Sequence, residues 1–383
     1  MKQGISVALT AVGAITPYGT GIEEFLAALP GLSRIETGGS EPPGEARQCL
    51  IREEQFAEMR GAKYFDRCTK LLYSAVRQYG GGLDGGDAET DRVCIAVGTA
   101  FSSITDFMEF LLSFERGGLR GLNPIVFPNT VQNCPASQLA ILLKIRGANI
   151  TLTSGLCAGL DALIAGYQMI DSGRMDRVIA GGVEESSVYT RAGFHNSLKS
   201  CPEHSFALAE AAGIVLLEQV PPGTHGAQMV GYAQSFFPGE KRTGAALSAA
   251  IERSMKRALA HAGLTPDDVS CLSLSANGLT AFDQAEFAAA GRLLQESRRP
   301  KRVLALKKLI GETAGAAGLL QTIAGANDRN LFLPHHHADC LPAAFVERHR
   351  QQLAEVSDGG HVLVNAVNWE GNISTVVVKP ARG

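Results

Sequence analysis

Apolar and polar residues follow two patterns along this chain, and the two patterns succeed one another repeatedly. Short apolar runs rich in β-branched residues, bounded by glycine or charge, are typical of strands in a buried parallel sheet. The longer segments between them carry apolar residues at helical spacing, as the helices that cover such a sheet do. The pattern therefore predicts a layered α/β protein.

The predicted elements fall into two sets, one in each half of the chain. In the first half we expect strands at residues 5–12, 93–97, 150–153, 177–180 and 213–217, and helices at 21–29, 69–79, 103–113, 137–143 and 159–172. In the second half we expect strands at residues 229–233, 271–275, 303–306, 361–367 and 374–379, and helices at 247–262, 282–295 and 314–324.

The two sets of elements have similar patterns, because each opens with a strand and closes with a valine-rich strand. This similarity predicts an internal duplication. The run Pro221-Pro222-Gly223-Thr224 separates the halves, since adjacent prolines and a glycine interrupt both helices and strands. We therefore divide the chain into an N-terminal domain, residues 1–222, and a C-terminal domain, residues 223–383.

Composition narrows the class of protein further. Of the 383 residues, 45% are hydrophobic and 19% are charged, a balance typical of globular domains. A net charge of -3 gives no general attraction to nucleic acid or to an anionic membrane. No apolar stretch reaches the ~18 residues of a membrane span, and the N-terminal apolar run is too short for a secretory signal. The eight cysteines are scattered without zinc-ligand spacing, which fits reduced thiols and predicts a cytoplasmic protein.

A strand followed directly by a helix, with a sharp turn between them, is predicted at residues 149–163. This layout is that of a nucleophile elbow, which presents one side chain at the tip of the turn. Further motifs follow the same chain order as in a known family and lie at residues 65–71, 127–133, 172–184, 275–278, 307–318 and 364–365. Each motif is weak alone, but together they span nearly the whole chain in register.

With these motifs the chain resembles the β-ketoacyl synthase family of condensing, thiolase-like enzymes. The resemblance implies a five-layered α-β-α-β-α fold, built from two related halves, that dimerises through extended sheet pairing. Active members hold the acyl chain on one cysteine, and two histidines assist decarboxylative condensation.

All three catalytic positions of the family differ in this sequence. Leu156 aligns with the cysteine, and an aliphatic side chain cannot be acylated. Asn277 aligns with the first histidine, as it does in some active relatives. Glu312 aligns with the second histidine, where a carboxylate repels a developing oxyanion or a malonyl carboxylate. The family lysine is retained as Lys307, and we expect it to form a salt bridge with Glu312.

The resemblance also marks positions for an acyl gate and an acyl tunnel. Active relatives end with glycines that let a phenylalanine swing aside, but here that run carries Asn368, Trp369 and Glu370 instead, which removes the hinge. Phe101, Ile104 and Met108 follow one another at helical spacing where related subunits carry tunnel-stopping residues. We therefore expect Phe101, Ile104, Met108 and Trp369 to line the substrate tunnel. Ordinary core packing is the alternative for this stripe.

The chain therefore resembles the chain-length factors, which are synthase-like subunits that lack the cysteine and pair with an active ketosynthase. That resemblance implies a heterodimer in fatty acid, polyketide or aryl-polyene biosynthesis, with no activity in this chain alone. It also implies no cofactor of its own, since an acyl carrier protein would deliver its phosphopantetheine to the partner subunit. A homodimer is the alternative assembly.

Two other sets of residues could carry chemistry. A one-residue slip at the elbow would present Cys157, whose thiol would be activated by a helix N-terminus; the alternative is a small buried side chain. An active acyltransferase, synthase or decarboxylase would then use Cys157 or Asn277. His335, His336 and His337 are consecutive and point in divergent directions, so we expect a surface or interface loop and no metal site. The glycine-rich stretches lack the motifs of nucleotide binding.

Overall fold

The computed structural model describes residues 6–35, 50–79, 90–199, 205–238, 244–327, 340–353 and 360–381. Strands of the N-terminal half are β1 (Ser6–Thr16), β2 (Gly19–Thr20), β3 (Val93–Gly98), β4 (Asn149–Leu152), β5 (Arg177–Glu184) and β6 (Ala211–Val220). Strands of the C-terminal half are β7 (Gln228–Phe236), β8 (Val269–Ser273), β9 (Arg302–Leu304), β10 (His361–Val367) and β11 (Asn372–Lys379).

The two halves share one strand topology. The N-terminal strands run in the order β4-β3-β5-β6-β1, and the C-terminal strands run in the corresponding order β9-β8-β10-β11-β7. In each half the second strand of this order is parallel to the first and the third, and the last two pairings are antiparallel. The sheets join where β1 pairs with β7 at Val7 and Ala8. The duplication that the sequence predicts is therefore present.

The α-helices are α1 (Ile22–Ala28), α2 (Arg67–Arg77), α3 (Ile104–Gly117), α4 (Cys134–Leu142), α5 (Ala158–Asp171), α6 (Val188–Leu198), α7 (Gly244–His261), α8 (Thr280–Glu296), α9 (Lys307–Ile310), α10 (Ala317–Ala326) and α11 (Ala343–Arg348). Short 3-10 helices are η1 (Leu29–Gly31), η3 (Glu53–Gln55), η4 (Ala62–Tyr64), η5 (Thr90–Arg92), η6 (Gly118–Gly121), η7 (Phe127–Thr130), η8 (Gly155–Cys157), η9 (Pro266–Asp268) and η10 (Ala314–Ala316).

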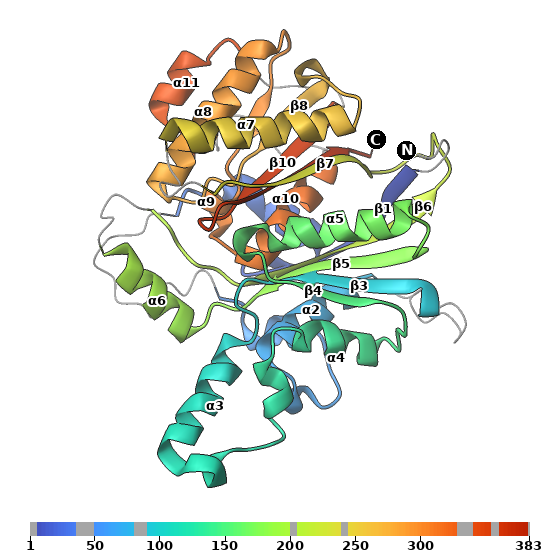
Figure 1. The fold of residues 1–383 in the computed structure, drawn as a ribbon, viewed down its shortest axis with the longest axis vertical. Helices are drawn as coiled ribbons and strands as arrows, with labels where there is room; N and C mark the ends of the chain where they lie inside the picture. The colour runs from blue at the N-terminus through green and yellow to red at the C-terminus, as the bar shows by residue number, and fades with distance from the viewer. Residues whose placement is uncertain are drawn as a thin grey trace.

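The helices and sheets are stacked in five layers (Figure 1). Helices α5 and α10 lie between the two sheets, α2 and α4 cover the outer face of the N-terminal sheet, and α7 and α8 cover the outer face of the C-terminal sheet. Every residue of α10 is buried, as expected for a helix that is enclosed on all sides. Leu160 and Leu163 of α5 pack in one hydrophobic cluster with Leu319 and Ile323 of α10. This is the five-layered thiolase-like fold that the resemblance implies.

Several elements differ from the sequence prediction. Helices α6 and α11 were not expected, because α6 mixes polar and apolar residues on every face and α11 is very short. Helix α3 begins at Ile104, so Phe101 lies in the loop before it and not within the helix. The predicted helix 314–324 is divided into η10 and α10, which ends later than expected.

The domain boundary at residue 222 stays a prediction. Strand β6 ends at Val220 and β7 begins at Gln228, so the proline-rich run lies in the connection between the halves. In the described part of the chain no helix combines the length and apolarity that a membrane crossing requires.

Candidate functional site

The predicted elbow is formed between β4 and α5, and Leu156 lies at its tip. Gly155 has a φ of 62°, a left-handed conformation that strongly favours glycine. A Cβ at this position would lie 2.6 Å from Nδ2 of Asn368, so the turn leaves no room for a side chain. The Leu156 side chain is buried. The elbow therefore presents an isobutyl group where a nucleophile would stand.

The space around Leu156 is too small for a substrate. It is a cavity of about 10 Å³, lined by residues that include Leu156, Ser275, Asn277, Glu286, Val367 and Trp369. Such a volume holds at most about one water molecule. The amide nitrogen of Leu156 lies 3.5 Å from Oδ1 of Asn368. An amide that could stabilise an oxyanion at this turn therefore faces a side-chain oxygen of this chain.

Cys157 points away from the elbow tip and into the core. Its side chain is fully buried, and its Sγ lies 3.4 Å from the carbonyl oxygens of Ala366 and Asn372. Burial raises the pKa of this thiol well above its usual range, and the nearby Asp161 raises it further. These effects outweigh Lys307, whose charge acts in the opposite direction. At Cys157 the geometry is that of a buried thiol.

The other two family positions are joined directly by a hydrogen bond. Asn277 Nδ2 donates to Oε2 of Glu312 over 2.6 Å, and Lys307 Nζ lies 3.1 Å from the same oxygen. The amide of Ala314 donates to the other carboxylate oxygen over 2.8 Å. The Lys307 and Glu312 side chains are 1% and 0% exposed. The salt bridge expected from the sequence is therefore present, and it is buried.

This network pairs the polar groups at the family positions with one another. A buried ion pair is favourable only when hydrogen bonds satisfy both partners, and Lys307 also donates to Oγ of Ser275 over 3.2 Å. The Asn277 amide group that would donate to a substrate oxygen is occupied by Glu312.

Two further carboxylates hold the loop that carries Asn277. Asp283 accepts hydrogen bonds from the amides of Asn277 and Gly278 and lies 2.9 Å from Nζ of Lys308. Glu286 accepts from the amide of Ser275 over 2.8 Å, and burial raises the pKa of its carboxyl to about 7. Both acids therefore support the loop that carries Asn277.

Glu184, at the end of β5, also supports a loop through its carboxylate. The sequence analysis includes this residue only as part of the motif at residues 172–184. Its carboxylate accepts hydrogen bonds from the amides of Ala100, Phe101 and Ser102 over distances of 2.7 to 2.9 Å. Burial raises the pKa of this carboxyl to about 7. Glu184 therefore positions the loop before α3, including Phe101.

A large apolar cavity of about 1160 Å³ lies between α3, α6 and the start of α8. All four predicted tunnel residues, Phe101, Ile104, Met108 and Trp369, line it. No residue of α3 is buried, so its stripe faces this cavity and does not pack in the core.

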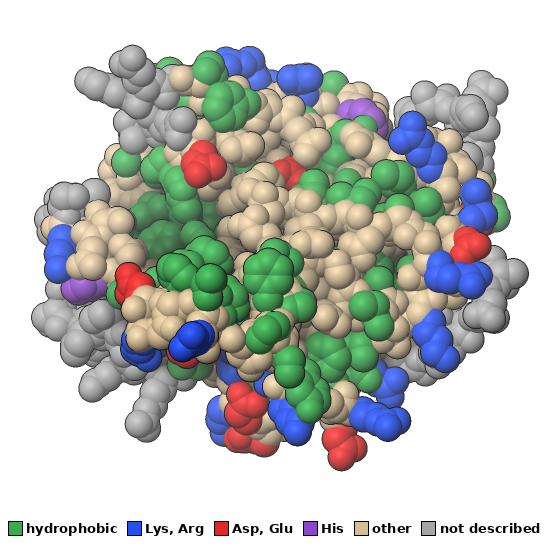
Figure 2. Space-filling view, turned by 60° about the horizontal axis from the view of Figure 1, so that its bottom comes forward, with side chains coloured by type: hydrophobic (Ala, Val, Ile, Leu, Met, Phe, Trp, Pro, Cys, Tyr) green, Lys and Arg blue, Asp and Glu red, His purple; other side chains and the backbone are tan. Residues whose placement is uncertain are grey.

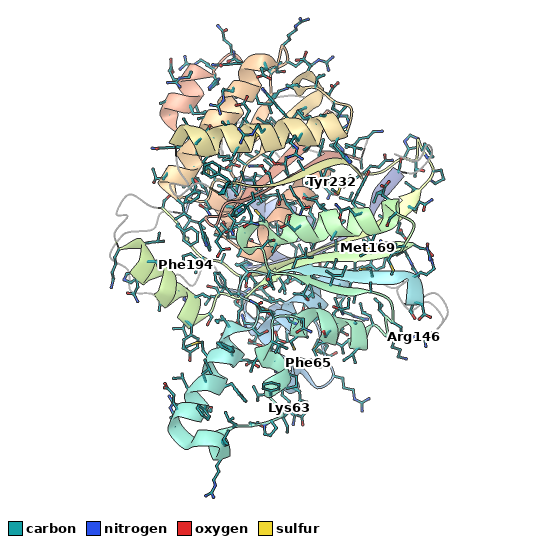
Figure 3. All side chains as sticks on the ribbon, in the orientation of Figure 1. Lys63, Phe65, Arg146, Met169, Phe194 and Tyr232 are labelled. Atoms are coloured by element: carbon teal, nitrogen blue, oxygen red, sulfur yellow. The ribbon has the colours of Figure 1, made fainter. Side chains whose placement is uncertain are left out.

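Phe194 is a cavity residue that the sequence did not reveal, because α6 was not predicted. It projects from α6 (Figure 3), and its ring lies 5.9 Å from that of Phe101 and 5.4 Å from that of Trp369. On its other side it stacks on Phe206 at 5.0 Å. Phe194 thus connects Phe101 and Trp369, the two aromatic residues predicted to line the tunnel, into one aromatic wall of the cavity.

Comparison with known families identifies the family of this chain. The family models described as the N-terminal and C-terminal domains of β-ketoacyl synthase match residues 51–221 and 227–327. The chain belongs to the β-ketoacyl synthase family. Two similar relatives of this ketosynthase-family chain are the 3-oxoacyl-[acyl-carrier-protein] synthases 2 of Staphylococcus aureus and Vibrio cholerae. They are 24% and 25% identical to it, and the matches cover 85% and 83% of this chain and 86% and 84% of those proteins.

Solved structures show the same fold as this ketosynthase-family chain. One is the ishigamide ketosynthase/chain length factor, with a TM-score of 0.75 and 22% identity, covering 98% of this chain and 100% of that chain. Another is a ketosynthase in complex with its chain length factor from Xenorhabdus doucetiae, with a TM-score of 0.76, 22% identity and 98% of each chain covered.

The ketosynthase-family chain also exposes many large apolar side chains along α3, α4 and the segment that joins them, here called the surface between α3 and α4. They are Phe107, Leu111, Phe114, Leu119, Ile125, Phe127, Val131 and Ile141. Leu119 is 81% exposed and Ile125 is 66% exposed. Hydrophobic side chains gather on the face that Figure 2 brings forward, which also contains a hollow with hydrophobic walls. Patches of this kind mark interaction surfaces in soluble proteins.

The remaining sequence candidates lie elsewhere. His335, His336 and His337 are outside the described residues. Within the described ranges no group of histidines, cysteines and carboxylates is arranged to hold a metal ion. The expectation that the chain needs no metal or cofactor stays a prediction.

Proposed function

We propose that this chain is a non-catalytic subunit of the chain-length-factor type, which pairs with an active ketosynthase and shapes its acyl tunnel. One observation carries the proposal: Asn277, Lys307 and Glu312 form a closed, buried network beside Leu156, which is not a nucleophile. Condensation requires an acylated thiol and polar groups that are free to bind the substrate. A chain with this arrangement contributes to synthesis through its shape.

The alternative is an enzyme that uses Cys157 or Asn277. The buried Cys157 thiol, whose pKa is raised, argues against a thiolate nucleophile. Asn277 already donates its amide to Glu312, which argues against its assisting decarboxylation. The relatives named as 3-oxoacyl-[acyl-carrier-protein] synthases favour the enzymatic alternative, and a labelling experiment separates the two functions.

The exposed apolar residues between α3 and α4 support the presence of a partner subunit. This surface continues from the residues of α3 that line the large cavity, so one partner could cover both. Structural relatives include ketosynthases solved with a chain length factor, which supports a heterodimer, with a homodimer as the alternative. In this proposal Phe101, Ile104, Met108 and Trp369 limit the acyl chain. The carrier protein delivers its phosphopantetheine to the partner.

The test compares this chain alone, an active ketosynthase alone, and the two together, each incubated with malonyl- and acyl-loaded carrier protein. We expect no condensation by this chain alone and restored or increased condensation when the two are combined. Mass spectrometry after treatment with a thiol-directed acyl inhibitor should show acylation of the ketosynthase only.

A Cys157→Ser variant serves as the control, and it should support the partner as well as the native chain does. Stable acylation of Cys157, or condensation by this chain in the absence of a ketosynthase, would contradict the proposal. A homodimer that leaves every tested ketosynthase unaffected would contradict the partner role.

A further inference from the structure

A second cavity, of about 480 Å³, lies in the C-terminal half between α8 and α11. One wall is a single face of α8, on which Gln284, Ala288, Gly291 and Gln295 follow one another at helical spacing. The other wall is α11 with the residue that follows it, His349. The volume is within the range of small-molecule sites.

Small side chains explain why the two helices leave a hollow. Ala288 and Gly291 on α8 and Ala344 on α11 all line the cavity, and none of them can fill it. Phe287 and Phe345 also line it, with their ring centroids 5.2 Å apart, and they provide aromatic surface. An apolar group of a ligand would gain contact with these two rings.

His349 adds a polar group that lacks a partner. Its side chain lines the cavity and is only 4% exposed, yet Nδ1 makes no hydrogen bond with the described part of the protein. The imidazole lies over Gly291, where a Cβ would come within 2.7 Å of Nε2. Burial and the charge of Arg348 lower the pKa of His349, so the ring is neutral near pH 7 and retains one N–H donor. Buried polar groups rarely remain unsatisfied, which points to a ligand.

The charges that line the cavity are all positive. Arg292 is held by Glu252 and Ser248, which fixes its position and partly offsets its charge. Arg348 is exposed and forms no ion pair within the described ranges. No described carboxylate lines the cavity. The site therefore favours an anion, and one available guanidinium suits a single carboxylate, which it can bind through two parallel hydrogen bonds.

We propose that the cavity between α8 and α11 binds a small organic carboxylate with an aromatic or aliphatic body. The carboxylate contacts Arg348 and a ring nitrogen of His349, and the apolar body lies against Phe287 and Phe345. This site is separate from the family's catalytic positions, and the inference does not depend on the proposed function.

Isothermal titration calorimetry of the full chain tests the inference, with 2-naphthoate as the probe and its neutral isostere 2-naphthamide as the comparison. We expect 2-naphthoate to bind at least about tenfold more tightly than the amide, because only the anion forms charge-assisted hydrogen bonds with arginine. Inorganic phosphate, which lacks an apolar body, should bind more weakly than 2-naphthoate.

Matched variants locate the site. Arg348→Gln should weaken 2-naphthoate binding about tenfold or more, and Ala344→Phe should block it by filling the hollow. Arg350→Gln removes the same charge two residues away, where the arginine pairs with Glu347 outside the cavity, and should leave the Kd unchanged. The fluorescence of Trp369, the sole tryptophan, should not change, since it lines the larger cavity.

Three results would overturn the inference: equal affinity for the acid and the amide, an unchanged Kd in Arg348→Gln, or no detectable binding. A change in Trp369 fluorescence that follows the binding curve would assign the probe to the larger cavity and would also overturn it. Circular dichroism of each variant confirms that the fold is retained.

Discussion

Glu312 shows how one substitution changes the electrostatics of a buried site. A histidine beside Lys307 can remain neutral, whereas a glutamate there is stable as an ion only with a cation and hydrogen-bond donors around it. Lys307, Asn277 and the Ala314 amide supply all of these. Asn277, Lys307, Glu312 and the Ala314 amide therefore form one buried, hydrogen-bonded unit.

Glu312→Ala should lower the free energy of unfolding by about 3 to 5 kcal/mol, because it leaves the Lys307 charge buried without its partner. The double variant Lys307→Met with Glu312→Leu should lose much less, since neither charge remains. Urea denaturation measures both.

The exposed pair of Lys256 and Glu296 provides the control for this prediction. Its side chains are 41% and 45% exposed, and Glu296→Ala should cost only about 0 to 1 kcal/mol. If Glu312→Ala costs no more than Glu296→Ala, the buried network does not stabilise the fold in the way described.

At the level of elements, glycines allow the backbones around the elbow to meet closely. Added Cβ atoms at Gly98, Gly159 and Gly182 would each lie within 2.3 Å of a carbonyl oxygen, and one at Gly315 would lie 2.6 Å from the Cα of Thr99. These contacts bring the ends of β3 and β5 against the start of α5 and η10. They fix the backbone of the elbow that carries Leu156.

Gly182→Ala should destabilise the chain by about 3 kcal/mol or more, because its Cβ would meet the carbonyl oxygen of Gly315 and the backbone cannot yield easily. Gly193→Ala is the matched control. It lies within α6 with no atom near its Cβ position, and alanine should stabilise the helix by about 0.5 to 1 kcal/mol. Thermal unfolding of both variants checks the prediction, and equal melting temperatures would contradict it.

At the level of the whole molecule, the surface between α3 and α4 leaves large hydrophobic side chains exposed. The duplicated sheets bury their own helices, as the all-buried α10 shows, but α3 has no buried residue. In Figure 1, α3 projects from the end of the molecule opposite α7. A partner that covers α3 would enclose the large cavity as well.

Leu119→Lys and Ile125→Lys should each weaken association with a ketosynthase partner about tenfold without changing the stability of the monomer, since both side chains are exposed. Ala260→Lys, on the exposed face of α7, should have no effect on association. Sedimentation analysis measures the association, and equal behaviour of all three variants would place the partner on another surface. If the chain forms a homodimer, the same substitutions should shift its monomer–dimer equilibrium.

The sequence by itself determined the layered architecture, the duplication, the elbow and the side chain at its tip. These features depend on local spacing, on turn residues and on motifs that lie within a short window of the chain. The sequence also indicated that the residues at three family positions differ from those of active members. It predicted the ion pair between Lys307 and Glu312, because these two residues lie close in sequence.

Only the tertiary structure decided how distant residues meet. Asn368 faces the Leu156 amide across 212 residues, and Cys157 lies against carbonyl oxygens of β10 and β11. The contact of Phe194 with Trp369 depends on α6, and the cavity beside His349 depends on α11. Neither helix has a clear hydrophobic pattern in the sequence. Such contacts arise from the packing of one half against the other and of helices against sheets. The spacing of residues along the chain does not predict which distant residues this packing brings together.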